Sequence, residues 1–153
     1  MFSDEYFMRY ALREAAKAAD SEDVPVGAVI VHKNHIIGRG WNQVELLKDP
    51  TAHAEMIAVT QAANHLGAKW LSDCALYVTI EPCSMCAGAL VLSRIDRVVY
   101  GAPDPKTGAG GSVLNILHHA KLNHRIKVKG GVLEQECASL LQDFFRKKRV
   151  KNN

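Results

Sequence analysis

Four residues in two short segments have the types and spacing needed for hydrolytic chemistry at a metal ion. One segment is His53-Ala54-Glu55, and the other is Pro82-Cys83-Ser84-Met85-Cys86. Cys83 and Cys86 are three residues apart, so their sulfurs lie on one face of a first helical turn. The helix dipole favours negative charge at an N-terminus, so thiols ionise more readily there. Two thiolates and one imidazole are donors that suit a tetrahedral Zn²⁺ ion.

The three candidate ligands, His53, Cys83 and Cys86, leave one position of a tetrahedral zinc open. Such a position can hold water and is typical of a catalytic zinc site. Glu55 can take a proton from that water and return it to a leaving amine. Because His53 and Glu55 are two residues apart, both can reach one site only at the very tip of a helix. The pattern predicts one zinc ion per chain, with Glu55 as the proton shuttle.

A Cys-x-x-Cys pair alone has other interpretations. It can be a redox pair or half of a structural four-ligand zinc site, although the sequence has no second such pair. The upstream His-x-Glu and the proline directly before Cys83 favour a catalytic zinc. We expect Cys74 and Cys137 to be small buried hydrophobes, and the other histidines fit no ligand spacing.

The length and composition indicate one soluble domain over residues 1–153, with 48% apolar and 23% charged residues. No apolar run approaches the roughly 20 residues of a membrane span. The acidic start, Met1–Glu5, lacks the order of a signal peptide. We therefore expect a cytoplasmic protein with reduced thiols and no membrane partner.

The elements that must position the candidate site follow from periodicity and turn signals. Helices are predicted from Ser3 to about Asp20, from about Ala52 to Leu66 with Thr51 or a neighbour as its cap, from Cys83 to about Ser93, and from Glu134 to about Lys148. Strands are predicted at 26–31, 36–38, 76–80, 97–100 and 126–132. The segment 40–49 is expected to be irregular, and the glycine-rich segment 101–111 to be a loop.

Strands that alternate with helices indicate an α/β layered domain, and the hairpin-like first pair favours a mixed sheet. The helix Cys83–Ser93 is apolar nearly all round, which predicts burial or a surplus apolar face at Leu90, Val91 or Leu92 for an isologous dimer. The C-terminal helix and tail, about 134–153, carry five cations within 146–151. These cations suit either a solvated helix end or a surface that contacts phosphates.

The sequence resembles the bacterial tRNA-specific adenosine deaminase family, within the cytidine/deoxycytidylate deaminase superfamily, over roughly residues 3 to 149. The H-x-E and P-C-x-x-C segments are the signature of the zinc nucleobase deaminases. Both motifs also occur in deaminases of free bases and nucleosides. Further similar segments lie at 24–29, 40–42, 49–55, 77–89, 106–109, 123–125 and 140–146.

This resemblance implies a three-layer α/β/α cytidine-deaminase-like fold with a five-stranded mixed sheet, and a homodimer with one zinc per subunit. It implies deamination of adenosine to inosine at the wobble position (34) of a tRNA anticodon stem-loop, by zinc-hydroxide attack on C6 with Glu55 moving protons. An unpaired loop base can leave its stack at low cost, in agreement with this chemistry. The family motifs imply substrate contact at Asn42. They suggest RNA-facing roles for Asp104, Lys106, Asn123 and Arg146.

Two other functions remain as alternatives. The first is a free-base or nucleoside deaminase acting on guanine, cytosine or cytidine. The basic C-terminal helix and the segment 123–125 speak against it, because a small substrate needs no phosphate-binding surface. The second is a non-catalytic zinc-stabilised RNA-binding module, and Glu55 speaks against it. Phe144 or Phe145 could stack on bases, but adjacent helical positions cannot share a face.

Overall fold

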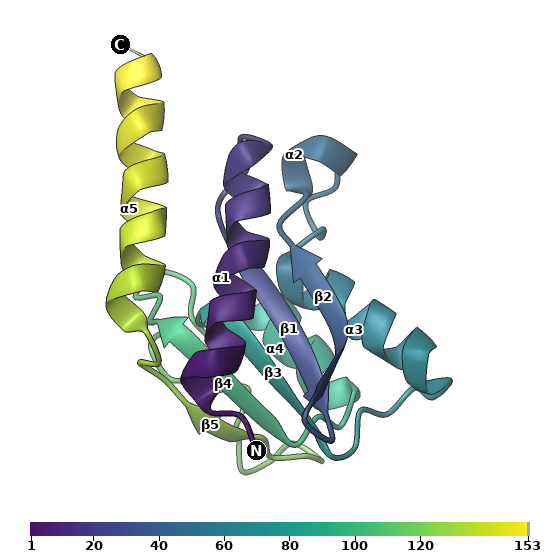
Figure 1. The fold of residues 1–153 in the computed structure, drawn as a ribbon. Coiled ribbons are helices and arrows are strands. Elements are labelled where there is room, and N and C mark those ends of the chain that lie inside the picture. Colours follow the sequence, from purple (N-terminus) through teal and green to yellow (C-terminus); the bar gives the residue numbers. More distant parts are fainter. Residues whose placement is uncertain (153) are drawn as a thin grey trace.

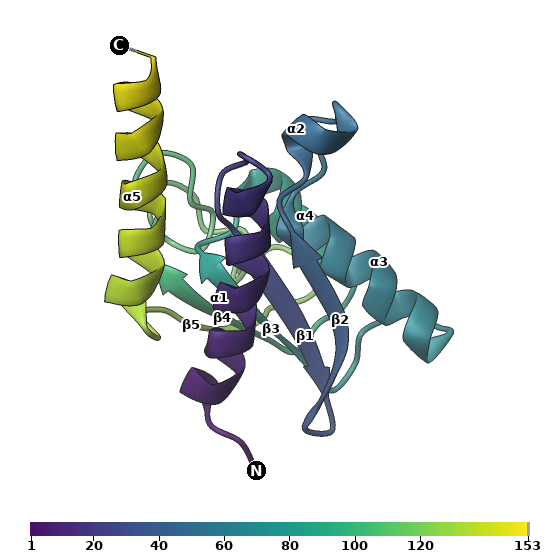
Figure 2. The same ribbon diagram turned by 45° about the horizontal axis from the view of Figure 1, so that its top comes forward.

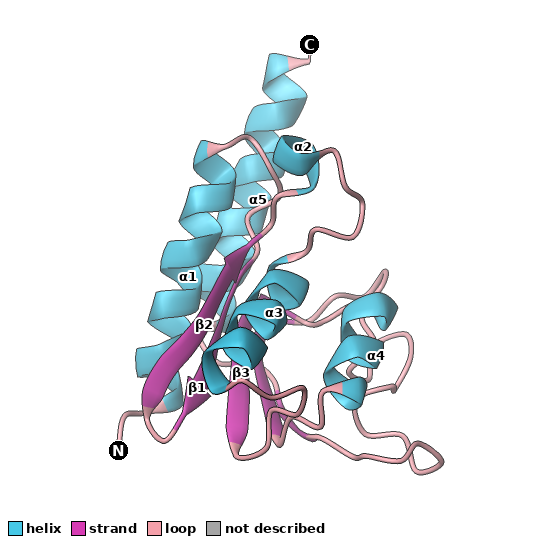
Figure 3. Cartoon of the chain, turned by 90° about the vertical axis from the view of Figure 1, so that its right-hand side faces the viewer, coloured by secondary structure: helices cyan, strands magenta, loops and turns pink. Residues whose placement is uncertain are grey.

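The computed structural model describes residues 1–152 and confirms the three-layer α/β/α arrangement. The helices are α1 Asp4–Asp20, α2 Val44–Leu47, α3 Ala54–Leu66, α4 Ser84–Leu92 and α5 Glu134–Lys151, and the strands are β1 Gly27–His32, β2 His35–Trp41, β3 Cys74–Ile80, β4 Arg97–Ala102 and β5 Lys127–Lys129. The sheet has the order β2-β1-β3-β4-β5 (Figure 1). Helices α1 and α5 cover one face, and α3 and α4 cover the other (Figure 3).

The sheet is mixed, as the sequence predicts. Strand β1 is antiparallel to β2 and β3, whereas β3, β4 and β5 are parallel. Lys33 and Asn34 join β1 to β2 with φ of 48° and 66°, and two positive φ values suit a tight hairpin turn. The parallel half brings the carboxyl ends of β3 and β4 together, at Ile80 and Ala102. Segments that follow parallel strands at this edge commonly carry function.

Helix α3 lies directly on strand β2, and two glycines make this contact possible. A Cβ atom at Gly40 would lie 2.1 Å from the carbonyl oxygen of Ala54, the first residue of α3. A Cβ atom at Gly38 would lie 2.5 Å from the carbonyl oxygen of Ala58. Any side chain at these positions would push the helix away from the sheet, so both glycines fix where α3 begins.

Two hydrophobic clusters fill the spaces on the two faces of the sheet. Along β3, Leu76 and Val78 pack toward α3 and α4, whereas Tyr77 packs toward α1. On the α1 side, Phe7 and Met8 are buried against the sheet. Burial on both faces explains why β1 and β3 read as continuous apolar runs in the sequence.

An ionic network ties the start of α1 to the sheet. The Asp4 carboxylate lies 2.7 Å from Arg97 and 3.0 Å from Lys129, and it accepts a hydrogen bond from the Tyr77 hydroxyl at 2.9 Å. The Arg97 guanidinium holds the pKa of Asp4 well below its usual range. This network therefore stabilises the folded state as long as Asp4 is ionised.

The start of α3 differs from the sequence prediction. The helix begins at Ala54 with His53 as its N-cap, not at Ala52 with Thr51 as the cap. The Thr51 hydroxyl instead donates to the Asp49 carboxylate at 2.7 Å. The His53 ring makes no capping hydrogen bond, because it is turned toward two cysteine sulfurs.

Other element bounds also differ from the predictions. The segment expected to be irregular contains the end of β2 and the one-turn helix α2, and β5 has three residues instead of seven. Helix α5 continues to Lys151 and extends past the sheet (Figure 2). Of the two alternatives predicted for α4, burial all round and a surplus apolar face, Leu92 fits the second, because its exposure is 80%. Among residues 1–152, no helix is long and apolar enough to cross a membrane.

Candidate active site

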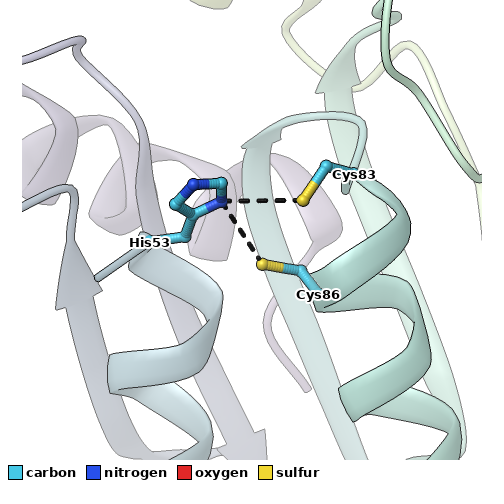
Figure 4. A group of neighbouring side chains, drawn as sticks. All are labelled: His53, Cys83 and Cys86. Carbon is cyan, nitrogen blue, oxygen red and sulfur yellow. Dashed lines mark hydrogen bonds between the residues drawn. The ribbon is translucent and has the colours of Figure 1, made fainter. Parts of the chain in front are cut away.

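The N-terminal ends of α3 and α4 bring three candidate metal ligands together (Figure 4). His53 and Cys83 are the N-caps of these helices, and both have extended backbones, with ψ of 154° and 175°. The His53 Nδ1 atom lies 3.6 Å from the Sγ atoms of both Cys83 and Cys86. All three ligand atoms lie within 4.8 Å of one another.

These separations fit a zinc ion. With Zn–S of about 2.3 Å and Zn–N of about 2.05 Å, tetrahedral angles place the nitrogen about 3.6 Å from each sulfur. One imidazole nitrogen and two sulfurs are also the donor set that zinc prefers. In the part of the chain that the structure describes, this is the one group of three or more His, Cys, Asp or Glu residues arranged to hold a metal ion.

The two cysteine sulfurs influence each other's ionisation. The hydrogen bond with Cys86, followed by that with His53, lowers the pKa of Cys83 to about 4. The same contact with Cys83 raises the pKa of Cys86. The Cys83 thiol therefore ionises more readily than the Cys86 thiol, and binding of a divalent cation, which needs thiolates, would release the protons that remain on the pair. Cys74 and Cys137 are free and buried, as the sequence predicts.

Glu55 is the second residue of α3 and is 3% exposed. Burial raises its pKa to about 7. A carboxyl group with a pKa near the working pH can both accept and donate a proton at neutral pH. His53 precedes the helix and Glu55 lies in its first turn, so two residues that would diverge on a regular helix line the same cavity.

A cavity of about 180 Å³ lies against these side chains. Its wall consists of Val24, Val26, Asn42, His53, Glu55, Ile80, Glu81, Cys83, Asp104 and Thr107. Sites for drug-sized ligands are typically about 300–1,000 Å³. The cavity is therefore of a size for one nucleobase, and the rest of a nucleotide would lie outside it.

Asn42 is held in the cavity wall by a buried carboxylate. Its side-chain nitrogen donates to Asp23 at 3.3 Å. Asp23 is 3% exposed and also accepts from the backbone N–H groups of Val24 at 2.8 Å and Glu45 at 2.9 Å. The Asn42 amide is thus held with its nitrogen toward Asp23, because an ionised carboxylate can only accept.

The four remaining residues expected to face substrate lie in four different places. Asp104 lines the cavity. Lys106 lies in a separate groove with Phe145 and Arg149, between the loop after β4 and helix α5. Asn123 and Arg146 also lie outside the cavity wall. Asn123 lines a groove beside Leu92, and Arg146 is exposed with an ion pair to Asp143.

Sequence reasoning gave no role to Asp23, Glu81 or Thr107. Burial alone would raise the pKa of Glu81, but hydrogen bonds from Ser112 and from three backbone N–H groups hold it below its usual value. The available signal for Glu81 was a carboxylate at the end of an apolar strand, directly before the Pro-Cys segment. Asp23 had no comparable signal, because its partners Asn42 and Glu45 lie 19 and 22 residues away in the sequence.

A histidine and two cysteines at helix tips, with a buried glutamate beside them on an α/β/α sandwich, define the class of the zinc nucleobase deaminases. The family model for MafB19-like deaminases matches residues 2–149. The tRNA-specific adenosine deaminase of Aquifex aeolicus is 53% identical over 145 residues, which are 95% of this chain and 95% of that protein. The chain belongs to the family of the tRNA-specific adenosine deaminases.

Solved structures agree with this assignment. A structure from a study of A-to-I editing by tRNA:A34 deaminases has a TM-score of 0.85 and 42% identity, over 89% of this chain and 99% of that chain. A guanine deaminase from Nitrosomonas europaea has a TM-score of 0.81 and 25% identity, over 94% of this chain and 85% of that chain. Deaminases of different substrates thus share this fold, so the choice of substrate must depend on side chains around the cavity.

Proposed function

We propose that the protein hydrolyses adenosine to inosine at position 34, the wobble position, of a tRNA anticodon. The observation that carries this proposal is the grouping of His53, Cys83, Cys86 and Glu55 at one base-sized cavity. Membership of the tRNA-specific adenosine deaminase family supports the choice of adenosine in tRNA. The proposal covers one catalytic unit over residues 1–153 that acts in the cytoplasm.

His53, Cys83 and Cys86 would hold one zinc ion per subunit. When bound, zinc lowers the pKa of water from about 15.7 toward about 7 and so supplies a nucleophile at neutral pH. Glu55 takes one proton of the attacking water and delivers it to the ring nitrogen N1, and it then transfers the second proton, from the new hydroxyl on C6, to the departing amine. The water oxygen becomes bonded to C6 of adenine, the bond between C6 and the exocyclic amine nitrogen breaks, and ammonia leaves.

The cavity wall would hold the flipped base. Val24, Val26 and Ile80 supply apolar surface for its faces, while Asn42 and Asp104 supply polar contacts. A base in an anticodon loop is unpaired, so its extrusion costs less than extrusion from a duplex. Because the cavity is small, the sugar and the phosphates would contact the protein outside it.

The groove between the loop after β4 and helix α5 would receive that part of the RNA. Lys106 and Arg149 line this groove together with Phe145, which is 42% exposed. An exposed aromatic ring in a groove with two cations can stack on a base while the cations contact phosphates. Phe144 lies on a different side of α5, in a groove formed with the end of α1, so Phe145 is the better candidate for stacking. Arg146 on the same helix would add a further phosphate contact.

We also propose a homodimer that covers the exposed side of α4. Leu92, Trp70 and Leu122 are 80%, 50% and 42% exposed and line one groove with Val91 and Asn123. Leu90 is fully buried in the core, so the suggestion that it contributes to this surface was wrong. Apolar side chains grouped on a surface are typical of an interaction site.

Incubation with an anticodon stem-loop, and separately with free adenosine, cytidine and guanine, tests the substrate. Inosine in the stem-loop together with unchanged small molecules is the expected result. Ammonia released from guanine or cytidine alone would instead favour the free-base or nucleoside deaminase, and stem-loop binding without turnover would favour a non-catalytic RNA-binding module.

A further inference from the structure

Glu81 is a buried carboxylate whose side-chain hydrogen bonds all come from one loop. It lies two residues before the ligand Cys83, and its exposure is 2%. One carboxylate oxygen accepts from the backbone N–H of Asp104 at 3.0 Å and from the Ser112 hydroxyl at 2.5 Å. The other accepts from the backbone N–H groups of Gly110 at 2.9 Å and Ser112 at 3.1 Å. No ion pair within residues 1–152 includes Glu81.

The loop that carries these donors is wrapped tightly around the carboxylate. A Cβ atom at Gly108 would lie 2.4 Å from both the carboxyl carbon and one oxygen of Glu81. A Cβ atom at Gly110 would lie 3.3 Å from the Glu81 side chain. The backbone N–H of Ala109 also donates to the carbonyl of Pro82 at 2.8 Å. The loop backbone is therefore in direct contact with the segment that ends in Cys83.

The opposite side of the same loop faces the cavity through Asp104 and Thr107. One oxygen of the Asp104 carboxylate accepts from the backbone N–H groups of Lys106 at 3.0 Å and Thr107 at 3.1 Å. The other accepts from the Thr107 hydroxyl at 2.7 Å. Residues 104–107 thus form one closed turn, and the N–H at its first residue is bound by Glu81.

We propose that Glu81 is a positioning residue for the substrate: it holds the loop 103–112 so that Asp104 and Thr107 face the base-sized cavity. This inference rests on the proposed deaminase function, because it assigns the loop to substrate binding. Glutamine at position 81 would have nearly the same size, but its amide nitrogen donates. That nitrogen would face the N–H and O–H donors of the loop in place of an acceptor. The loop would then lose hydrogen bonds to the side chain at position 81.

The first experiment compares Glu81→Gln with the matched control Glu14→Gln. Glu14 is buried to a similar degree, with 3% exposed, but it pairs with Lys17 on α1 and does not line the cavity. With an anticodon stem-loop as substrate, Glu81→Gln should raise KM at least fivefold while kcat changes less than twofold and zinc content is unchanged. A KM change below twofold, a loss confined to kcat, loss of zinc, or an equal KM increase in Glu14→Gln would overturn the proposal.

A double-mutant cycle tests whether Glu81 acts through the loop. If it does, Thr107→Ala should raise KM in the wild-type background and have little further effect in Glu81→Gln. Independent, multiplicative effects would overturn the proposal. Ser112→Ala removes one donor at an exposed position, so it gives a milder version of the same test if Glu81→Gln does not fold. It should then raise KM by a smaller factor, and an unchanged KM would count against the proposal.

Amide hydrogen exchange separates this inference from the proposed function, because it needs no substrate. Exchange at the amides of Asp104, Gly110 and Ser112 should become at least tenfold faster in Glu81→Gln and stay unchanged in Glu14→Gln. If the wild-type enzyme deaminates no stem-loop, the proposed function fails and the assignment of the loop to substrate binding fails with it. Unchanged exchange in Glu81→Gln, in a wild type that is active, would overturn the positioning role alone.

Discussion

His53 lies one residue before the first turn of α3 and Glu55 lies within it, so the two side chains line one cavity although they are only two residues apart. The extended backbone of His53 turns its ring toward the sulfurs. The helical backbone of Glu55 places its carboxyl against the same space, where burial raises its pKa to about 7.

The variant Glu55→Gln separates proton transfer from metal binding. It should retain one zinc per chain and the wild-type fold, because the amide replaces the carboxyl at equal size. The rate of inosine formation should fall about 10²–10⁴-fold, the range attributed to general acid–base catalysis. Single-turnover assays with an anticodon stem-loop measure this loss, and turnover at the wild-type rate would remove Glu55 from the mechanism.

The cysteine pair should be needed for metal retention. Cys83→Ala and Cys86→Ala should each lose most of the bound zinc, because two ligands rarely hold the ion against competing buffer. Cys74→Ala is the matched control, since Cys74 is also buried but lies outside the ligand group. The zinc content of each variant is measured by atomic absorption after dialysis. Full retention of zinc in both Cys83→Ala and Cys86→Ala would show that these residues do not hold the metal.

The groove beside Phe145 should contribute to RNA binding through phosphate contacts. Arg149→Ala should weaken binding of the stem-loop and reduce the slope of log affinity against log salt by roughly 0.7–0.9, the value for one lost contact. The control is Arg9→Ala, an exposed cation on α1 outside the groove. Fluorescence anisotropy over a salt series measures both the affinity and the slope. Identical slopes for the two variants would show that Arg149 makes no phosphate contact in this groove.

The exposed side of α4 should be covered by a second copy of the chain. Light scattering at micromolar concentration should give twice the chain mass of 16.8 kDa. Leu92→Asp should shift the mass toward the monomer, because an ionised side chain in an apolar interface is costly. A wild-type mass of 16.8 kDa would contradict the dimer, and a dimeric Leu92→Asp variant would place the interface elsewhere.

The Asp4 network should make stability depend on acid pH. The carboxyl has a lowered pKa in the folded state, so its contribution is present above its unfolded pKa of about 3.9 and is lost as pH falls below that value. Asp4→Asn should cost about 1–2 kcal/mol at pH 7, a figure reduced because Arg97 is partly solvent-exposed. Urea denaturation at pH 7 and pH 3 measures the difference between variant and wild type, which should shrink at pH 3.

The sequence predicted the layers of the fold and the grouping of the three candidate metal ligands because both depend on local patterns. Alternation of strands with helices gave the α/β class, and the spacing of Cys83 and Cys86 at a helix start brought their sulfurs to one face. The start of α3 was wrong by two residues, since the use of His53 as N-cap depends on sulfurs 30 residues away. Local capping rules include no such long-range contact.

The parts that the sequence did not predict depend on tertiary contacts. Leu92 and Leu90 are the same residue type two positions apart, yet one is exposed and the other is buried, because only one face of α4 meets the sheet. Glu81 and Asp23 are charged residues that folding buries, and each is compensated by N–H donors from distant segments. A single sequence does not reveal such compensation, since the donors are backbone groups present at nearly every position.

The close approach of Gly40 to the carbonyl oxygen of Ala54 couples strand β2 to the candidate metal site. Ala54 is the residue directly after His53, so any side chain at position 40 would displace His53 from Cys83 and Cys86, the other two candidate ligands at the start of α4. Zinc coordination tolerates only a few tenths of an ångström in ligand distance. The affinity for zinc should therefore depend on the distance between α3 and the sheet. A titration with zinc would detect a change in this packing even where the helix content stays the same.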